Sequence, residues 1–344
     1  MVDFIQYRLP NKNQYVVLEI NADTEELFSP KELSGKHGFV FAPFSPSEKE
    51  PIYLFHPNRI TVCEIKDPDK VTHSSNYINS LCEDRDLYSK SFNLFHKNLI
   101  EGKFQKIVLA RKQELNVTNV NPTELFIDAC KMYPNMFIAL VKSEKAGTWL
   151  TATPEILLSG DKNEWHTMAL AGTMKSSGRD KNPFDLTEWS KKNVEEQKIV
   201  ADYIFTRIEN LANIQAVKGP YTSYASDLLH LRTDFSFIPK DVEKIGELID
   251  MLFPTPAVCG LPKEKARDFI IENEGINRHF YSGFIGPLSM NDSTSIYVTL
   301  RCMSIRDNNC CLYAGGGLLV QSNEENEWNE TAAKMDTMKK LLCF

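Results

Sequence analysis

The sequence has no run that approaches the roughly 18 apolar residues needed by a membrane-spanning helix. Its first residues, MVDFIQYRLPNKNQ, show neither the charged-then-apolar pattern of a signal peptide nor the composition of a transit peptide. It also lacks an excess of positive charge, since 39 Lys and Arg stand against 46 Asp and Glu, for a net charge of −7. A protein that binds nucleic acid regardless of sequence needs a basic face. These absences argue against a membrane protein and against a nucleic-acid-binding protein.

The eight cysteines are scattered, and none forms a Cys-x-x-Cys pair. Cys310 and Cys311 are neighbours on an expected strand and should point to opposite faces. We therefore expect free thiols in a reducing compartment, which predicts a cytoplasmic protein. The chain shows no internal repeat, low-complexity tract or linker. Its content of 42% hydrophobic and 25% charged residues is typical of a soluble globular protein with an ample core.

The chemically richest part of the chain is its last quarter, Phe253–Lys334. Two β-rich runs there, Ile296–Ile305 and Cys311–Val320, are separated by a turn-prone stretch and predict a hairpin. Alternation along the first run places Arg301 on one face of a continuous strand. The second run is expected to break at Gly315–Gly317, where absent side chains let a ligand approach the backbone. No Lys-Ser or Lys-Thr pair follows these glycines, so a P-loop is not indicated.

A helix predicted after the glycines carries Glu327, Glu330 and Lys334 on one face, because spacings of three and four bring side chains together. With Arg301 and the bare backbone within 34 residues, these carboxylates indicate a site for an anion and a divalent cation. Simpler alternatives stay open at this point. The arginine could be an edge-strand charge, the glycines a bulge or turn, and the glutamates a solvated helix face.

Two charged residues interrupt strands that are otherwise apolar. Lys106 opens the strand Lys106–Ala110, either as its solvated end or as a partly buried lysine that acts as a base. Glu155 follows a proline within the run Thr148–Leu158, and a proline inside a strand indicates an edge or a bulge. If Glu155 is buried, its pKa rises and it can act as an acid near neutral pH; otherwise it is an ordinary edge-strand charge.

Apolar periodicity and capping residues predict the helices. They are expected over residues 76–102, Pro122–Met132, Val242–Met251 and Pro262–Glu274. Thr187 is the expected N-cap of another long helix that ends near Ala212, and the polar stretch Met174–Thr187 before it is expected to be a loop. On this long helix Glu196 borders the buried stripe, whereas Glu195 faces solvent.

Ten short motifs occur in a fixed order along the chain. They are KIVLAR (Lys106–Arg111), TPE (Thr153–Glu155), LAGT (Leu170–Thr173), KNVEE (Lys192–Glu196), HLRT (His230–Thr233), PTPAVCG (Pro254–Gly260), RHFYSG (Arg278–Gly283), LRC (Leu300–Cys302), YAGGG (Tyr313–Gly317) and EWNET (Glu327–Thr331). This series resembles the chorismate-utilising enzymes, which include isochorismate, salicylate, anthranilate and aminodeoxychorismate synthases. The resemblance covers roughly residues 75–340.

The resemblance implies an α+β fold, a single domain of two large, mostly antiparallel β-sheets flanked by helices, with the active site between them. Residues 1–75 would form an N-terminal β-rich part of this domain, with predicted strands at Tyr15–Ile20, Gly38–Phe41 and Ile60–Ile65. Residues 76–344 would form the chorismate-binding catalytic core.

Site roles follow from the resemblance by position. It implies that Glu196, Glu327 and Glu330 surround Mg2+, which holds the ring carboxylate of the substrate chorismate. The enolpyruvyl carboxylate would be held by Arg301, Tyr281 and the backbone N–H near Gly315. The same cavity would be lined by His230, Thr173 and Lys334.

Lys106 indicates which member of the family this chain is most similar to. Members that add ammonia have glutamine at this position, whereas members that add water have lysine, because water must lose a proton as it attacks. Ala171 stands where aminodeoxychorismate synthases carry a nucleophilic lysine. No glutamine amidotransferase segment is present, and no such subunit is expected as a partner. One departure is Gln197, where relatives often have histidine.

The resemblance therefore implies an isochorismate synthase, an isomerase in which Lys106 activates water for addition at C2 and Glu155 protonates the departing C4 hydroxyl. One alternative is a salicylate synthase, which forms isochorismate and then eliminates pyruvate. Another is a chorismate-binding protein without activity, although that would need no acid–base pair. Whether the product feeds menaquinone, a siderophore or salicylate stays open.

Overall fold

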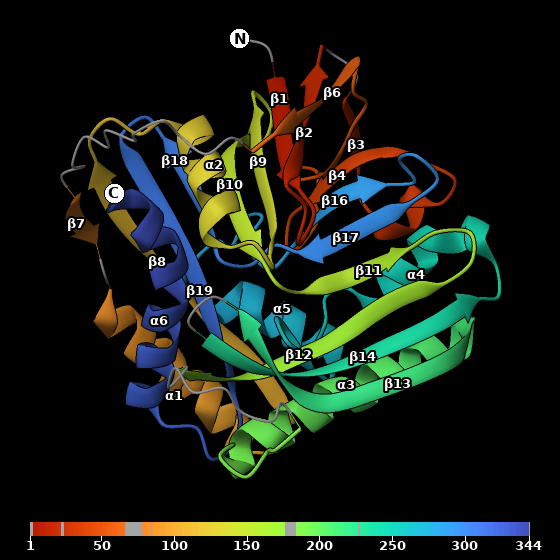
Figure 1. The fold of residues 1–344 in the computed structure, drawn as a ribbon. Helices are drawn as coiled ribbons and strands as arrows, with labels where there is room; N and C mark the ends of the chain where they lie inside the picture. The colour runs from red at the N-terminus through yellow and green to blue at the C-terminus, as the bar shows by residue number, and fades with distance from the viewer. Residues whose placement is uncertain are drawn as a thin grey trace.

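Two antiparallel β-sheets, joined by chain crossovers near the centre of the molecule, form most of the structure (Figure 1). This computed structural model describes residues 3–21, 24–65, 78–82, 84–175, 184–225 and 228–343. Neighbouring strands run antiparallel throughout these residues, in agreement with the predicted fold class. No helix in the described ranges is both long and apolar enough to cross a membrane.

Within the described residues the first sheet has ten strands, and it contains the glycine triplet. In spatial order it runs β15 (Gly260–Leu261), β8 (Lys106–Val117), β19 (Asn309–Leu318), β18 (Cys302–Arg306), β10 (Gly147–Thr153), β9 (Phe137–Ser143), β1 (Asp3–Arg8), β2 (Gln14–Ile20) and β6 (Arg59–Glu64), with β7 (Ile78–Cys82) paired to β8. The second sheet has nine strands in the part of the chain that the structure describes. Its order is β13 (Ala212–Ala225), β14 (Leu228–Pro239), β12 (Trp165–Lys175), β11 (Ile156–Gly160), β17 (Thr294–Val298), β16 (Phe284–Leu288), β4 (Gly38–Ala42), β5 (Ile52–Phe55) and β3 (Thr24–Leu27). Strands of the first 65 residues thus join both sheets.

Six α-helices of the described residues cover the sheets. They are α1 (Arg85–Ile100), α2 (Pro122–Met132), α3 (Lys191–Leu211), α4 (Ile245–Leu252), α5 (Lys263–Asn273) and α6 (Glu324–Leu342), and two 3₁₀ turns also occur, η1 (Pro30–Leu33) and η2 (Val242–Lys244). α3 packs on β12 and β14, and α6 packs on β19. Asn323 caps α6, whose first turn is acidic and whose last turn holds Lys339 and Lys340, as the helix dipole favours. These two helices approach the site from different sides.

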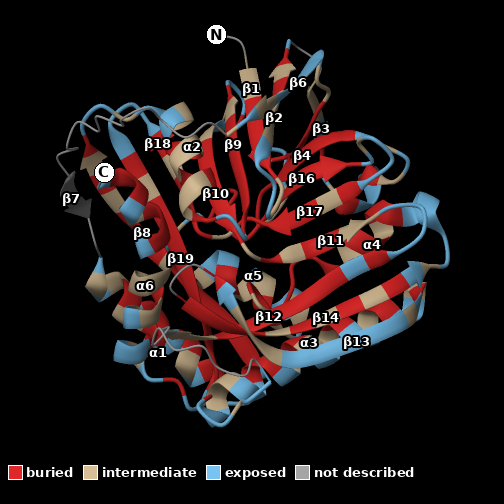
Figure 2. Ribbon diagram, viewed as in Figure 1, coloured by how far each residue is buried: buried red, intermediate tan, exposed pale blue. Residues whose placement is uncertain are grey.

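An aromatic core fills the space between the two sheets on the N-terminal side of the molecule. Phe137 of β9 stacks on Tyr297 of β17 with ring centroids 4.2 Å apart, and Phe41 of β4 stacks on Phe280 at 4.0 Å. The central strands are mostly buried, whereas the edge strand β13 is largely exposed (Figure 2). Burial of these rings holds the sheets in a fixed relation beside the site.

Two neighbouring crossovers carry the chain between the sheets. At Pro154 and Glu155 the chain leaves β10 in the first sheet and enters β11 in the second. At Thr299–Arg301 it returns from β17 in the second sheet to β18 in the first. β10 pairs with β18 and β11 pairs with β17, so the two crossovers lie side by side. The predicted continuous strand Ile296–Ile305 is therefore wrong, because its two halves pair in different sheets.

The same division corrects the prediction for Arg301. The residue immediately precedes β18 and has a φ of 44°, a left-handed conformation that interrupts the alternation assumed for a continuous strand. The hairpin prediction itself is confirmed, since Arg306 pairs with Asn309 across a two-residue turn. The predicted break at Gly315–Gly317 is wrong, because β19 continues through the triplet and pairs with β8 as far as Leu318.

Helix boundaries were predicted with mixed success. α2 spans the predicted Pro122–Met132, where the Asn121 side chain accepts from Thr123 N–H and a proline occupies the first turn. Within the predicted helix 76–102, Ile78–Cys82 forms strand β7 instead, and α1 begins only after its cap Asp84. The cap of α3 is Ser190 rather than Thr187. Most of the predicted loop 174–187 lies outside the described residues.

Candidate active site

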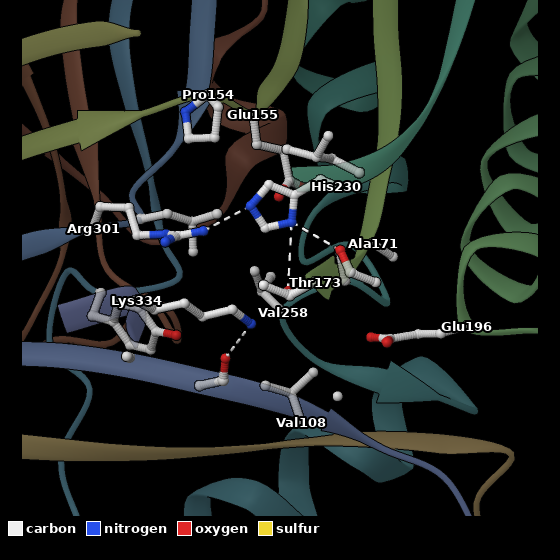
Figure 3. Close-up of a pocket in the computed structure, with 18 of the residues that line it drawn as sticks. Val108, Pro154, Glu155, Ala171, Thr173, Glu196, His230, Val258, Arg301 and Lys334 are labelled. Carbon is white, nitrogen blue, oxygen red and sulfur yellow. Dashed lines mark hydrogen bonds between the residues drawn. The ribbon is translucent and has the colours of Figure 1, made fainter. Parts of the chain in front are cut away.

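A cavity between the sheets collects residues from both crossovers, from β12 and β19, and from α3 and α6 (Figure 3). Among its walls are Glu155, Thr173, Glu196, His230, Tyr281, Arg301, Gly315 and Lys334. Lys106 lies beside this cavity and contacts Glu196. Glu327 and Glu330 line an adjoining pocket, and Thr173 belongs to the walls of both. The structure thus brings every site residue predicted from the sequence to one region.

The glycine triplet forms an open backbone edge at this cavity. β18 begins at Cys302 opposite Tyr313, so the next residues of β19 extend past it toward the cavity. Lys334 Nζ donates to the carbonyl of Gly315 at 2.9 Å. A Cβ at Gly317 would lie 2.0 Å from Glu196 Oε1. Glycine is required there because a side chain and the carboxylate cannot share the space.

Arg301 is a buried cation aimed at the cavity. Its Nη2 donates to His230 Nε2 at 2.9 Å, and His230 Nδ1 donates to the carbonyl of Gly172 at 2.8 Å. Within the described residues Arg301 Nη1 has no hydrogen-bond partner. Burial lowers the pKa of Arg301 to about 10, so the guanidinium stays charged near neutral pH. A buried charged donor of this kind needs an anion, and a carboxylate matches its geometry.

His230 is therefore a neutral support for Arg301. Burial, followed by the positive charges of Arg301 and Lys334, lowers the pKa of His230 to about 3. The hydrogen bond to the Gly172 carbonyl fixes the proton on Nδ1, which leaves Nε2 as the acceptor. Beside it, burial raises the pKa of Tyr281 to about 12, so this hydroxyl keeps its proton and can donate to the same anion.

Glu155 has the properties of an acid that is protonated near neutral pH. It is 2% exposed, and burial raises its pKa to about 7, although Lys106, Lys334 and Arg301 act in the opposite direction. The Thr255 hydroxyl donates to Glu155 Oε1 at 3.3 Å. Glu155 is buried, as expected if the proline interrupts the strand, because the chain crosses from one sheet to the other at Pro154 and Glu155.

Lys106 and Glu196 form a buried ion pair at the cavity wall. Lys106 is 0% exposed, and its Nζ lies 2.8 Å from Glu196 Oε1. Apart from this contact, Lys106 Nζ has no partner among the described residues, so the ammonium group has unused donor capacity. Glu196 is buried and Glu195 is exposed, in agreement with the helical phase predicted for α3.

The two remaining glutamates lie on α6, and each contacts a lysine. Glu330 Oε1 accepts from Lys334 Nζ at 2.7 Å, one helical turn away. Glu327 Oε1 accepts from Lys192 Nζ of α3 at 2.5 Å. The other oxygen of Glu327 is buried and has no hydrogen-bond partner within the described ranges. Burial and the nearby carboxylates Glu330 and Glu196 raise the pKa of Glu327 to about 7, against the influence of Lys192.

These carboxylates fit a hard divalent cation. No group of three or more His, Cys, Asp or Glu in the described part of the chain is already arranged as a metal cluster. The donor set nevertheless offers what Mg2+ binds, namely carboxylate oxygens, one of them buried and unpaired in Glu327. The lysine partners partly neutralise this negative charge, and a divalent cation would do so more fully.

A bulge in β12 shapes the cavity wall next to α3. The strand register shifts just after Ala171, and Gly172 takes a φ of +70°. The Gln197 side chain accepts from the Ala171 N–H at 2.9 Å and donates to the Ala169 carbonyl at 3.2 Å. Gln197 thus ties α3 to the bulge next to Glu196.

Sequence reasoning assigned no role to Lys192 or Thr255, which both contact predicted site residues. Lys192 precedes Glu196 by four positions, so helical spacing places both on one face of α3. That spacing could have identified Lys192. No local signal marks Thr255, because its contact with Glu155 depends on the packing of segments 100 residues apart.

Comparison with known proteins gives the family. A model of the chorismate binding enzyme family matches residues 55–343. The isochorismate synthase MenF of Escherichia coli (strain K12) is 31% identical over 265 residues, which cover 75% of this chain and 61% of that protein. The salicylate biosynthesis isochorismate synthase of Pseudomonas aeruginosa is 28% identical over 246 residues, 70% of this chain and 52% of that protein. The chain thus spans about three fifths or less of the length of these relatives.

Solved structures show the same fold. MenF from Escherichia coli superposes with a TM-score of 0.80 at 23% identity, over 99% of this chain and 89% of that one. Anthranilate synthase component I from Streptococcus pneumoniae superposes with a TM-score of 0.70 at 16% identity, over 97% of this chain and 89% of that one. The predicted architecture of two sheets flanked by helices is confirmed. Because the family model also covers most of its length, this chain belongs to the chorismate binding enzyme family.

Proposed function

We propose that this protein is an isochorismate synthase, which isomerises chorismate by adding water at C2 and expelling the hydroxyl at C4. The observation that carries the proposal is the placement of an acid and a lysine at one cavity beside an unsatisfied buried arginine. Glu155 holds a proton near neutral pH, Lys106 lies beside the cavity wall, and Arg301 offers a free donor to an anion. The MenF relative, named as an isochorismate synthase, supports the same activity.

Arg301 and Tyr281 would bind the enolpyruvyl carboxylate of chorismate, together with a backbone N–H near Gly315. The guanidinium presents Nη1 to this carboxylate while His230 holds Nη2. The open edge of β19 lets the substrate approach the backbone closely. These contacts orient the ring rather than react with it, which lowers the entropic part of the barrier.

The proton transfers would be divided between Lys106 and Glu155. In its neutral form the Lys106 amine takes a proton from the water as the water oxygen bonds to C2, the ring double bond shifts, and the C4–O bond breaks. Glu155 gives its proton to the departing hydroxyl, which leaves as water. One proton is taken up and one is released, so product and substrate are isomers.

Glu196, Glu327 and Glu330 would hold Mg2+, and Thr173 and Lys334 would complete the surrounding wall. When bound, the cation supplies positive charge that fixes the ring carboxylate of the substrate. Glu327 and Glu330 come from α6 and Glu196 from α3, so the position of the site depends on the packing of both helices.

We further infer that the reaction takes place in the cytoplasm and supplies menaquinone or siderophore synthesis. The described cysteines carry no disulfide, which supports a reducing compartment. The structural relative MenF is named as menaquinone-specific, and the P. aeruginosa relative is named for salicylate biosynthesis. The partner expected at the site is chorismate alone.

Incubation of the pure protein with chorismate and Mg2+ near neutral pH tests the proposal. The expected result is an equilibrium mixture of chorismate and isochorismate, separated by chromatography, with little salicylate. Pyruvate and salicylate in equal amounts, formed faster than from free isochorismate, would instead make the protein a salicylate synthase. Binding of chorismate without any turnover would make it a chorismate-binding protein without activity.

A further inference from the structure

Each of the three glutamates at the candidate metal site has a lysine of its own. Lys106 pairs with Glu196 at 2.8 Å, Lys334 with Glu330 at 2.7 Å, and Lys192 with Glu327 at 2.5 Å. Lys106 and Lys334 also have positions explained by the proposed reaction, since one borders the cavity and the other holds the Gly315 carbonyl. The proposed reaction gives Lys192 no role.

We propose that Lys192 occupies the place of the divalent cation at Glu327 in the metal-free enzyme and must leave that carboxylate when the metal binds. This inference rests on the proposed function, because it takes the three glutamates as the metal ligands. Lys192 is thus a positioning residue that sets the affinity for the cation. It also keeps the three carboxylates from repelling one another while the cation is absent.

The contact geometry supports a competition for Glu327. This side chain is 3% exposed, and one of its oxygens is bonded to Lys192 while the other is buried without a partner. Glu330 and Glu196 both act on Glu327 electrostatically, so three negative charges converge here. A cation that enters among them must share or replace the positive charge that Lys192 already supplies.

The surroundings of Lys192 allow it to move away, in contrast to Lys106. The Lys192 side chain is 18% exposed and lines the adjoining pocket with Asn193, Asn326 and Glu327. Lys106 is fully buried, so its ammonium group has no comparable route to solvent. A long, flexible lysine at a pocket wall can turn toward water without disturbing the helix that carries it.

Removing the competing ammonium should strengthen cation binding. Titration calorimetry with Mg2+ alone, without chorismate, measures this directly on the full chain. We expect Lys192→Met to bind Mg2+ more tightly than the wild type, by about tenfold, a difference of about 1.4 kcal/mol. In the presence of a chelator, Lys192→Met should melt at a lower temperature than the wild type, because the variant leaves Glu327 buried without its partner.

The matched control is Lys198→Met. Lys198 lies on the same helix and pairs with Asp202, but both side chains are exposed, so its loss should change neither the Mg2+ affinity nor the melting temperature in chelator. Lys192→Gln provides a second variant that keeps a polar side chain and should also bind Mg2+ more tightly. Circular dichroism of each variant verifies the fold before titration.

Two different failures can be told apart. If the wild type binds Mg2+ but Lys192→Met and Lys192→Gln bind it equally well or more weakly, Lys192 supports the site and the competition is overturned. If the wild type shows no Mg2+ binding at all, both the competition and the proposed metal site are overturned.

Discussion

Glu155 and Arg301 stand on adjacent crossovers, and hydrogen bonds between the two segments fix their relation. The Ala152 N–H donates to the Arg301 carbonyl at 3.0 Å, and the Val298 N–H donates to the Glu155 carbonyl at 3.0 Å. The same exchange of strands between sheets therefore positions the proposed acid and the proposed carboxylate-binding cation. Because backbone bonds set this relation, substitutions of either side chain should change chemistry with little change in fold.

The first prediction concerns the protonation of Glu155. Its carboxyl must be protonated to release the C4 hydroxyl, and its pKa is about 7. The rate of the proposed reaction should therefore fall as the pH rises above about 7, and Glu155→Gln should lose nearly all turnover. Initial rates of isochorismate formation from pH 6 to 9 measure this. A rate that rises steadily through pH 8 would contradict the role of acid.

The same substitution, Glu155→Gln, should raise the stability of the folded protein at high pH, although it removes activity. The folded-state pKa of Glu155 lies above its ordinary value of 4.5, so its contribution to stability is full below pH 4.5 and is lost as the pH rises through about 7. Glu155→Gln removes this loss. The variant should gain up to about 3 kcal/mol over the wild type between pH 5 and pH 8. Thermal melts at the two pH values give the difference, and an equal effect at both would argue against a buried carboxyl.

Lys106→Gln should stop water addition while chorismate still binds. The substitution keeps a polar side chain at this position and removes the proposed base. The expected loss in rate is roughly 10²–10⁴-fold, the range for one acid–base group. Product analysis and a chorismate binding titration are run on the same preparation. If binding disappears while the bound fraction still reacts at the normal rate, Lys106 holds substrate instead.

The fold was predictable where local signals and pairing agree. The Asn-Pro start of α2 places its N-terminus, and the turn between Arg306 and Asn309 places the hairpin. The residues Thr299–Arg301 contain neither glycine nor proline, so no local signal marks the passage from one sheet to the other. Ile78–Cys82 fits a helical period but pairs with β8, because long-range pairing overrides periodicity in a short segment.

Some contacts of the candidate site could be predicted from local sequence, and others could not. Helical spacing alone groups Glu327, Glu330 and Lys334, because the contacts involved are one turn apart. The contact of Lys192 with Glu327 joins residues 135 positions apart and depends on how α3 and α6 pack. The support of Arg301 by His230 spans 71 positions and depends on the strand crossover. Such contacts follow from the tertiary structure and are not visible in local sequence.

His230→Phe should weaken substrate binding more than it slows the chemistry. The variant removes the acceptor that holds Arg301 Nη2, and a hydrogen bond to a charged group contributes about 1.5–3 kcal/mol. We expect KM for chorismate to rise roughly 10- to 100-fold with a smaller change in kcat. In the wild type, KM should show no midpoint near pH 6, because the pKa of His230 is about 3. A midpoint there would mean that this histidine titrates and does not act as a neutral acceptor.

Two glycine substitutions should differ in severity because their new methyl groups meet different neighbours. In Gly317→Ala the Cβ would lie 2.0 Å from Glu196 Oε1 and 2.7 Å from Lys106 Cε, both of which are buried and cannot easily move. In Gly316→Ala it would lie 2.8 Å from Glu327 Oε2, a longer separation from a single side chain. We therefore expect Gly317→Ala to lose both Mg2+ binding and turnover, and Gly316→Ala to keep a measurable part of each. Calorimetry and product assays on both variants show which substitution is the more severe. Equal losses, or a milder effect at Gly317, would show that the open edge of β19 does not hold the ion pair in place.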